Sequence, residues 1–358
     1  IHGAQTKSKA APFNLISIIP EATDGMFHLR NDTPFPAQIY TCPNLRGLDT
    51  LYIVVKQTYD LMPSPAIAET QQPIIEVDQY WDEPGRSSLK YAGEIHLEKP
   101  GTDVVLIGEA CSPNGRPVTE MNVGISVAGR EHILKIFGDR RWKKGFLSFG
   151  IDPPRPFTRM PLRYERAFGG MHIIDETSAN ILAEKKNPVG KGFTGRRSAR
   201  EIDGMELPNI EDPADLIKSP TDTPAPACFG YVAPNWEPRI NYVGTYDETW
   251  RKTIMPGMPE DFDPRFYHMA HPGLIFSPHL KGGEPVILVN LSEQGRLNFT
   301  IPEDEPKIEA NINGRFETAK ANLETILLEP MEERMCLLWR AALPGGKKIP
   351  GAEVEVTI

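Results

Sequence analysis

Metal-ligating residue types gather in one short stretch of this 358-residue chain. His268, His271 and His279 lie within twelve residues of one another, and Asp261 and Asp263 come just before them. Imidazole and carboxylate together bind zinc or iron, so Asp261, Asp263, His268 and His271 allow a metal-dependent hydrolase or lyase. However, the histidines lack helical i,i+4 spacing and stand among prolines, which favours ordinary loop histidines. We keep the metal site as an alternative and predict no bound metal or cofactor.

A second cluster is the run Arg163, Tyr164, Glu165 and Arg166, with Phe168 close behind. In one interpretation Glu165 is a general base and an arginine stabilises an oxyanion. In the other, which we favour, the guanidinium groups bond the carbonyls and carboxylates of a chain without regular ladders. In extended chain Arg163 and Glu165 would share one face. Alanine at Tyr164 or Phe168 should cost about 3 kcal/mol of stability if these rings are buried, or binding energy if they face a partner.

Arginine and aromatic residues recur in two further places. Arg140 and Trp142 follow a predicted strand, and Tyr246, Asp247 and Trp250 lie together in the middle of the chain. Such residues are typical of hot spots in protein interfaces, so these positions, with His271, are candidates for partner binding as well as for structure. A weaker alternative is a carbohydrate-binding sandwich in which Trp236, Tyr246 and Trp250 stack on sugars.

Other common chemistry has no motif here. Gly124 to Ala128 approaches a nucleophile elbow but ends in alanine and lies inside a predicted strand. The Gly169-Gly170 and Gly282-Gly283 pairs lack the lysine and the following helix of a phosphate loop. We therefore predict neither a serine hydrolase nor a nucleotide-binding protein.

Charge and cysteine usage restrict the partners and the compartment. The net charge of −9 argues against nucleic acid or an anionic membrane as the main partner. No apolar run approaches the ~18 residues of a membrane span, and residues 1–11 lack the apolar part of a signal peptide. The cysteines form no C-x-x-C pair and are predicted to be buried thiols in the cytoplasm. They are Cys42, Cys111, Cys228 and Cys336.

The elements that position these residues are predicted to be strands. Residues 51–56 and 104–107 resemble strands buried on both faces, because their apolar runs are short and continuous. Three hairpins are predicted from apolar runs that flank short polar or glycine-containing turns. Their turns are at residues 128–130, 293–295 and 330–333.

The middle of the chain differs in kind. The chain contains 35 prolines, many of them between residues 150 and 278, and these break any periodic element. The same stretch holds many aromatic residues, which disordered chains lack, so it is predicted to be ordered, extended chain. The predicted fold is mainly β, an antiparallel sandwich-like core from the first and last thirds with this Pro-rich segment wrapped over it. The predicted regions are a flexible segment 1–13, a β region 14–150, the wrapped segment 151–278 and a β region 279–358.

Several motifs in fixed order carry a resemblance to a known family. The long central motif is residues 160–170, Met-Pro-Leu-Arg-Tyr-Glu-Arg-Ala-Phe-Gly-Gly. Around it, in chain order, lie Gly101-Thr102-Asp103-Val104-Val105, Gly138-Asp139-Arg140 with Trp142, Asn187-Pro188-Val189-Gly190, Leu207-Pro208-Asn209, Gly244-Thr245-Tyr246-Asp247 with Trp250, and Leu338-Trp339-Arg340. From about Asn14 to Ala342 the chain resembles the domain of unknown function 2169 family, which is encoded in bacterial type VI secretion clusters.

This resemblance implies a cytoplasmic adaptor or chaperone that holds a toxin effector and helps to load it onto the secretion spike. It implies no established catalytic residue. One departure is residues 270–274, where family members often have a Pro-Pro-Asp-Gln stretch and this chain has His271. The expected partner is therefore a secreted effector, the spike or both. This chain itself is expected to have no enzyme activity, and the sequence leaves its oligomeric state open.

Overall fold

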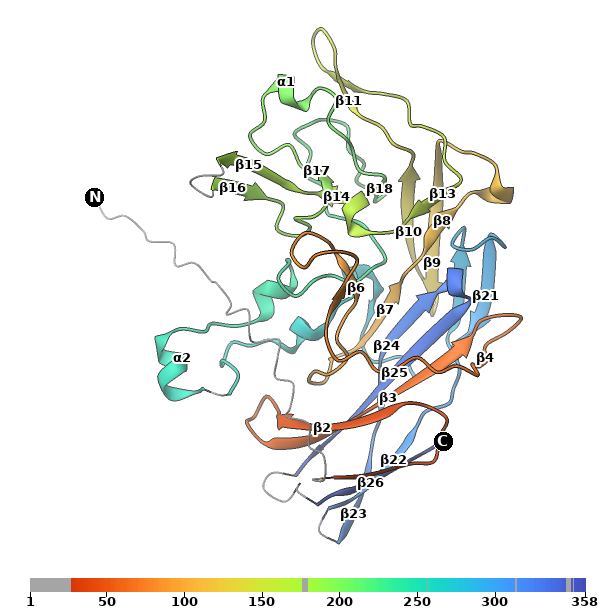
Figure 1. Cartoon of the computed structure of the whole chain (residues 1–358), viewed down its shortest axis with the longest axis vertical. Coiled ribbons are helices and arrows are strands. Elements are labelled where there is room, and N and C mark those ends of the chain that lie inside the picture. The colour runs from red at the N-terminus through yellow and green to blue at the C-terminus, as the bar shows by residue number, and fades with distance from the viewer. Residues whose placement is uncertain (1–26, 176–179, 256, 313, 346–348, 350) are drawn as a thin grey trace.

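The computed structural model describes residues 27–175, 180–255, 257–312, 314–345, 349 and 351–358 (Figure 1). The predicted flexible segment 1–13 lies outside these residues. The mainly β prediction is confirmed, since strands dominate and the only α-helices described are α1 (Ala199–Ile202) and α2 (Glu248–Thr253). Most strand pairs are antiparallel, whereas three pairs among the described strands are parallel. These are β1 (His28–Asn31) with β26 (Glu353–Thr357), β7 (Thr102–Leu106) with β24 (Asn322–Glu329), and β14 (Phe168–Gly169) with β17 (Lys191–Gly192).

The largest sheet has seven strands in the order β19-β7-β24-β25-β3-β2, with the short β4 beside β3. Strands from the first and last thirds of the chain pair directly here, because β7 lies beside β24 and β3 beside β25. The bounds are β2 (Ala37–Pro43), β3 (Asp49–Asp60), β4 (Ala66–Ile67), β7 (Thr102–Leu106), β19 (Ile275–Phe276), β24 (Asn322–Glu329) and β25 (Arg334–Pro344).

Two further sheets complete the β framework. One has the order β18-β10-β9-β20-β21 and the other β1-β26-β22-β23. The strands of the first are β9 (Glu120–Val127), β10 (Arg130–Phe137), β18 (Ile210–Glu211), β20 (Pro285–Val289) and β21 (Arg296–Thr300). Those of the second are β1 (His28–Asn31), β22 (Lys307–Ile312), β23 (Arg315–Ala319) and β26 (Glu353–Thr357).

All three predicted hairpins are present as β9–β10, β20–β21 and β24–β25. In the first, Ala128 and Gly129 both have positive φ, +52° and +79°, as a two-residue turn that matches strand twist requires. The alternating burial of β9 follows from its sequence, because Met121, Val123 and Ile125 point into the core. Short loops and period-2 patterning were therefore sufficient signals for these elements.

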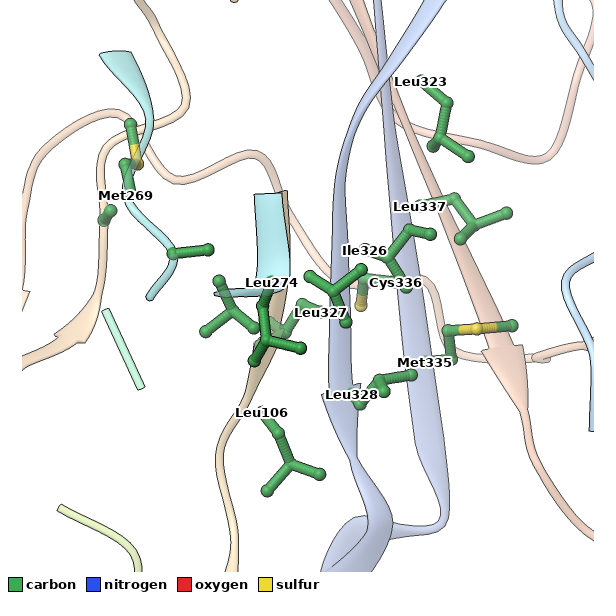
Figure 2. Packing of buried hydrophobic residues seen from close by; sticks show 14 of the residues in the cluster. Leu106, Met269, Leu274, Leu323, Ile326, Leu327, Leu328, Met335, Cys336 and Leu337 are labelled. Atoms are coloured by element: carbon green, nitrogen blue, oxygen red, sulfur yellow. The ribbon is translucent and has the colours of Figure 1, made fainter. Parts of the chain in front are cut away.

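The apolar core is shared by the sheets and by the Pro-rich middle. Figure 2 shows Leu106 of β7, Leu327 and Leu328 of β24 and Leu337 of β25 in one cluster with Met269 and Leu274. The middle segment also contributes Phe229 and Trp236, which are buried, and it supplies β18 and β19 to the two larger sheets. It is therefore built into the core as well as wrapped over it.

Shorter elements lie outside these three sheets, in the N-terminal third as well as in the middle. The two-stranded pairs are β5 (Gln79–Tyr80) with β6 (Leu89–Tyr91), β8 (Glu109–Cys111) with β13 (Arg159–Pro161), β11 (Trp142–Lys144) with β12 (Phe149–Ile151), β14 (Phe168–Gly169) with β17 (Lys191–Gly192), and β15 (Met171–Asp175) with β16 (Asn180–Ala183). Six 3₁₀ turns cover Pro113–Gly115, Tyr164–Arg166, Arg239–Tyr242, Pro264–Tyr267, Pro272–Leu274 and Pro330–Glu332. None of the described helices is long and apolar enough to span a membrane.

Candidate functional site

The central motif forms a tight turn. Residues Tyr164–Arg166 are a 3₁₀ turn, so the prediction of extended chain at this point is wrong. The Arg163 guanidinium lies 3.4 Å from the centre of the Trp81 ring, a cation–π contact. Glu165 accepts hydrogen bonds from the backbone N–H and the hydroxyl of Ser88, at 2.6 and 2.8 Å. Both carboxylate oxygens of Glu165 are thus engaged, which supports a structural role over that of a general base.

The two rings of the motif are buried. Tyr164 is 3% exposed and meets Trp236 edge to face, with 5.4 Å between ring centres. Burial raises the pKa of Tyr164 well above its ordinary value. Phe168 packs with Trp142 in a separate small apolar cluster. Because Trp236 is covered in this way, it cannot stack on a sugar, and the carbohydrate-binding alternative loses one of its three rings.

Asn187, which lies in a neighbouring segment, holds the central motif in place through hydrogen bonds. Its side-chain amide donates to the carbonyl oxygens of Tyr164 and Phe168 at 2.8 and 2.9 Å, and Asn187 is fully buried. Gly169 has φ of +151°, and a β-carbon there would lie only 2.0 Å from the carbonyl oxygen of Asn187. Only glycine allows this approach, so the Gly-Gly and Asn-Pro-Val-Gly motifs of the sequence require each other.

Two more sequence motifs, those that contain Arg140 and Asn209, pack beside the central motif. Arg166 donates to the Asn209 side chain at 3.1 Å, and the Asn209 amide in turn donates to Asp139 at 3.1 Å. Arg140 is buried and forms an ion pair with Glu211. We call residues 137–142, 163–170, 187–192 and 207–211 the motif knot. Most of its polar groups bond one another, while Arg140 Nε and Asn187 Oδ1 are buried without a hydrogen-bond partner among the described residues. These contacts give a structural reason for four family-like motifs.

The four residues of the predicted metal cluster point to different partners. Asp261 accepts from Thr245, Asp263 pairs with Arg265, His268 bonds Asp103, and His271 accepts from the Gly273 backbone. Within the described ranges, no group of three or more His, Cys, Asp or Glu side chains is placed to hold a metal ion. The sequence neighbourhood therefore does not become a spatial cluster, because each of the four side chains bonds a different partner and the 3₁₀ turn Pro264–Tyr267 separates the two aspartates from the two histidines.

His268 belongs instead to a buried charged group. Its Nδ1 lies 2.7 Å from an Asp103 oxygen, and the Lys99 ammonium lies 2.7 Å from the other oxygen and 2.8 Å from the Thr325 hydroxyl. The side chains of Lys99 and Asp103 have no exposure. Burial opposes the charge of Asp103, but Lys99 and His268 outweigh it and lower the pKa of that carboxyl. This group holds the middle segment against β7 and β24.

A cleft of about 190 Å³ opens between β2, the strap formed by residues 73–97, and the middle segment. Its lining is mostly aromatic, aliphatic and sulfur-containing. The lining residues are Tyr40, Cys42, Pro43, Glu76, Val77, Asp78, Gly93, Ile95, His96, Leu97, Pro234, Arg239, Met258, Phe266, Tyr267 and Met269. Concave, largely apolar sites with a few polar groups are the usual form of binding sites in proteins.

Beneath the cleft lies a fully bonded polar floor. Arg340 donates to Glu324 at 2.6 Å, to the Glu94 carbonyl at 2.7 Å and to the hydroxyl of Tyr40, and lies 3.3 Å from Nε2 of His96. Burial and then the charge of Arg340 lower the pKa of His96 well below its ordinary value. The imidazole is therefore neutral and held in place at neutral pH.

Cys42 is the cleft's thiol. Burial raises its pKa to about 11, despite the opposing charge of Arg340. The thiolate is the nucleophilic form, and at neutral pH almost none of it is present. The cleft therefore binds through shape and polarity, and it presents no activated nucleophile from Cys42.

Three of the predicted partner-binding residues lie in or beside α2, and one of them, Tyr246, touches a wall of the cleft. Tyr246 packs edge to face on Trp250 at 4.6 Å, and its hydroxyl contacts the sulfur of the cleft residue Met258 at 3.7 Å. Asp247 accepts from two backbone N–H groups at the start of α2, which projects from the body of the molecule (Figure 1). His271 lies elsewhere, with its ring 4.5 Å from that of His132.

Sequence reasoning missed the tip of the β11–β12 hairpin. Phe146 is 101% exposed and Leu147 is 92% exposed, the highest values among the large apolar side chains described. The tip is ordered by a hydrogen bond from Gly145 N–H to the Ser148 carbonyl at 2.9 Å. A signal was present, since Lys143, Lys144 and Gly145 directly before Phe146 favour a turn between two short strands.

Comparison with known proteins gives one match. A family model described as "Uncharacterized protein conserved in bacteria" (DUF2169) matches residues 46–340, which includes the motif knot and most of the cleft. Searches of curated proteins and of solved structures find no significant match.

Proposed function

Since the chain belongs to the DUF2169 family of uncharacterized bacterial proteins, we propose that it is an adaptor that binds another protein. Its partner in this proposal is a type VI secretion effector, which it holds in the cytoplasm and helps to load onto the spike. The secretion role comes from the family resemblance of the sequence. Support for protein binding comes from the surface of this chain.

The observation that carries the proposal is the exposed hairpin tip. Phe146 and Leu147 are adjacent and almost entirely in water. Moving such side chains out of water is worth about 1.5 to 3 kcal/mol each, so their exposure in the free chain is unfavourable. Large apolar side chains presented together are typical of an interface that a partner covers.

The hairpin presents this tip on a firm base. Trp142, at the start of β11, is 2% exposed and packs among Phe168, Ile202 and Leu207. Lys144 N–H donates to Asp203 at 2.8 Å, which ties the outer end of the strand to the loop after α1. A pre-ordered tip loses little conformational entropy on binding, which favours affinity.

The test is co-expression of the chain with the effector gene beside it, followed by size-exclusion chromatography with light scattering. We expect a stable complex with the wild-type chain, and a loss of at least about tenfold in affinity for the double variant Phe146→Ser, Leu147→Ser. Both side chains are in solvent, so the variant should fold with a stability change of about 0.5 kcal/mol or less.

The matched control is Phe316→Ser on β23, where the ring is 78% exposed on a different sheet. This variant should keep the wild-type affinity. If no complex forms with the wild-type chain, the adaptor proposal is wrong. If the complex forms equally well with the double variant, the tip is not its contact.

A further inference from the structure

Strand β2 forms one edge of the seven-stranded sheet and pairs only with β3 among the described residues. Lys56 N–H bonds the Pro36 carbonyl, and Asn44 N–H bonds the Leu48 carbonyl. Antiparallel pairs alternate between bonded and non-bonded residues, so positions 36, 38, 40, 42 and 44 face β3. The N–H and C=O groups of Ala37, Ile39 and Thr41 therefore point away from the sheet, and within the described chain they have no backbone partner.

This edge lacks the usual protection against pairing. Natural edge strands carry charges, prolines or bulges, or are covered by other chain. Residues 37–42 are Ala-Gln-Ile-Tyr-Thr-Cys, without charge or proline, and their register with β3 has no irregularity. Prolines mark only the two ends of the strand, with Pro36 just before it and Pro43 as its last residue. The edge is therefore chemically ready to accept one more strand.

The cleft opens along the same strand. Tyr40 and Cys42 line it, and their side chains share one face of β2 because they are two residues apart. A strand added beside β2 would send every second side chain toward this face. Cavities of about 150 Å³ hold a benzene-sized group, so a cleft of about 190 Å³ fits a single large apolar side chain.

Charged side chains at the edge of the cleft, which we call its rim, favour particular residues in the rest of the added strand. Glu76 is exposed, and its one side-chain hydrogen bond is to the neutral amide of Gln38 at 3.3 Å. Asp78 accepts from the Gly93 N–H at 2.8 Å. The cation in the cleft lining, Arg239, is buried, donates to the carbonyls of Val232 and Phe266 and interacts with the charge of Asp78. Glu76 is therefore the rim carboxylate whose charge is directed to a partner. With a net charge of −9 on the chain, the rim is complementary to lysine or arginine.

We infer that β2 receives an extended basic segment of a partner protein, which pairs with Ala37, Ile39 and Thr41 and inserts one apolar side chain into the cleft. This inference rests on the proposed protein-binding function and names the kind of segment that is recognised. Backbone pairing supplies affinity independent of sequence, whereas the cleft and the acidic rim supply specificity.

The probe is a phage-displayed library of random twelve-residue peptides, selected on the immobilised full chain. We expect enrichment of sequences with an aromatic or aliphatic residue between lysines or arginines. The selected peptide is then synthesised and its affinity measured by calorimetry. Methylation of its alternate backbone nitrogens should weaken binding at least about tenfold, because it removes the donors that a strand needs.

Two protein variants complete the experiment. Thr41→Pro removes the outward N–H while leaving the bonds to β3, and proline is tolerated on edge strands, so it should weaken peptide binding at least about tenfold. Its matched control is Thr41→Val, which keeps the N–H and should bind as the wild type does. Glu76→Lys, an exposed change that should not affect folding, should weaken binding by reversing the rim charge.

Failure of the inference and failure of the proposed function give different results. If no basic sequence is enriched, or if Thr41→Pro and Glu76→Lys bind as the wild type does, the strand-addition site is wrong. An effector complex that forms normally in that case leaves the adaptor function standing. If the effector does not bind, but the selected peptide does and Thr41→Pro weakens its binding, the effector is not the partner and the strand-addition site stands.

Discussion

His271 is a neutral imidazole in the folded chain. Burial and then the neighbouring His132 lower its pKa to about 4, against a weaker opposite effect of Asp212. The unfolded chain, with an ordinary histidine pKa near 6.5, therefore binds more protons between about pH 4 and 6.5. Protonation of His271 therefore leaves the free energy of unfolding unchanged above that pH range and lowers it as the pH falls through the range.

The expected result is a loss of up to about 3 kcal/mol of folding free energy from this residue between pH 7 and pH 4. His271→Asn removes the titrating group and can keep the hydrogen bond from the Gly273 N–H, so its stability should fall less steeply with acid. Urea unfolding at several pH values measures both slopes. Parallel curves for the variant and the wild type would show that His271 is not the group responsible.

At the scale of single residues, the sequence names a cluster but not its conformation. The Arg163 to Phe168 run is the densest polar cluster of the sequence, and the contacts of Glu165 fit the structural interpretation that we favoured for it. Its local conformation was wrong, because the 3₁₀ turn depends on Asn187, which lies outside the run. Phe146 was overlooked because an apolar residue between two strands is normally expected to face inward.

At the scale of elements, the motif knot joins the ends of β14 and β17 through Asn187. Asn187→Ala would leave the carbonyls of Tyr164 and Phe168 without these donors in a dry environment. Each such loss costs about 1 to 3 kcal/mol, so we expect destabilisation of about 2 to 4 kcal/mol. Asn187→Asp keeps the shape but places oxygens against oxygens, and should be at least as harmful.

Chemical denaturation of Asn187→Ala measures this effect. Asn298→Ala is a suitable control, since this asparagine is exposed on β21 and should change stability by about 0.5 kcal/mol or less. Equal stability of the two variants would mean that the knot does not hold the segments together.

Hairpins were predictable and long-range pairs were not. β9–β10 and β24–β25 carry their own turns, so the local pattern contains both partners of each pair. The parallel pair β7–β24 joins Asp103 to Thr325, and nothing in either local pattern indicates the other. The cleft depends on β2, the strap and the middle segment together, which is why sequence found only the wall near Tyr246 and Trp250.

At the scale of the whole molecule, strands from both thirds share one sheet, and the middle segment shares its core. We therefore expect one cooperative unfolding transition. Heating monitored by far-ultraviolet circular dichroism and by tryptophan fluorescence should give coincident curves. Two separated transitions would show that the first and last thirds unfold as independent units.

The pairing of β7 with β24 also has a consequence for biosynthesis. More than two hundred residues separate these neighbours in the chain. At about 5 to 20 residues per second, a ribosome needs roughly 10 to 45 s to make that length. During this interval β7 and β3 have emerged without their C-terminal neighbours, and their apolar faces are open to other chains. The main sheet of this protein is thus completed only after β24 and β25 have been made, and the nascent segment that carries β3 and β7 is the part that needs protection from aggregation until then.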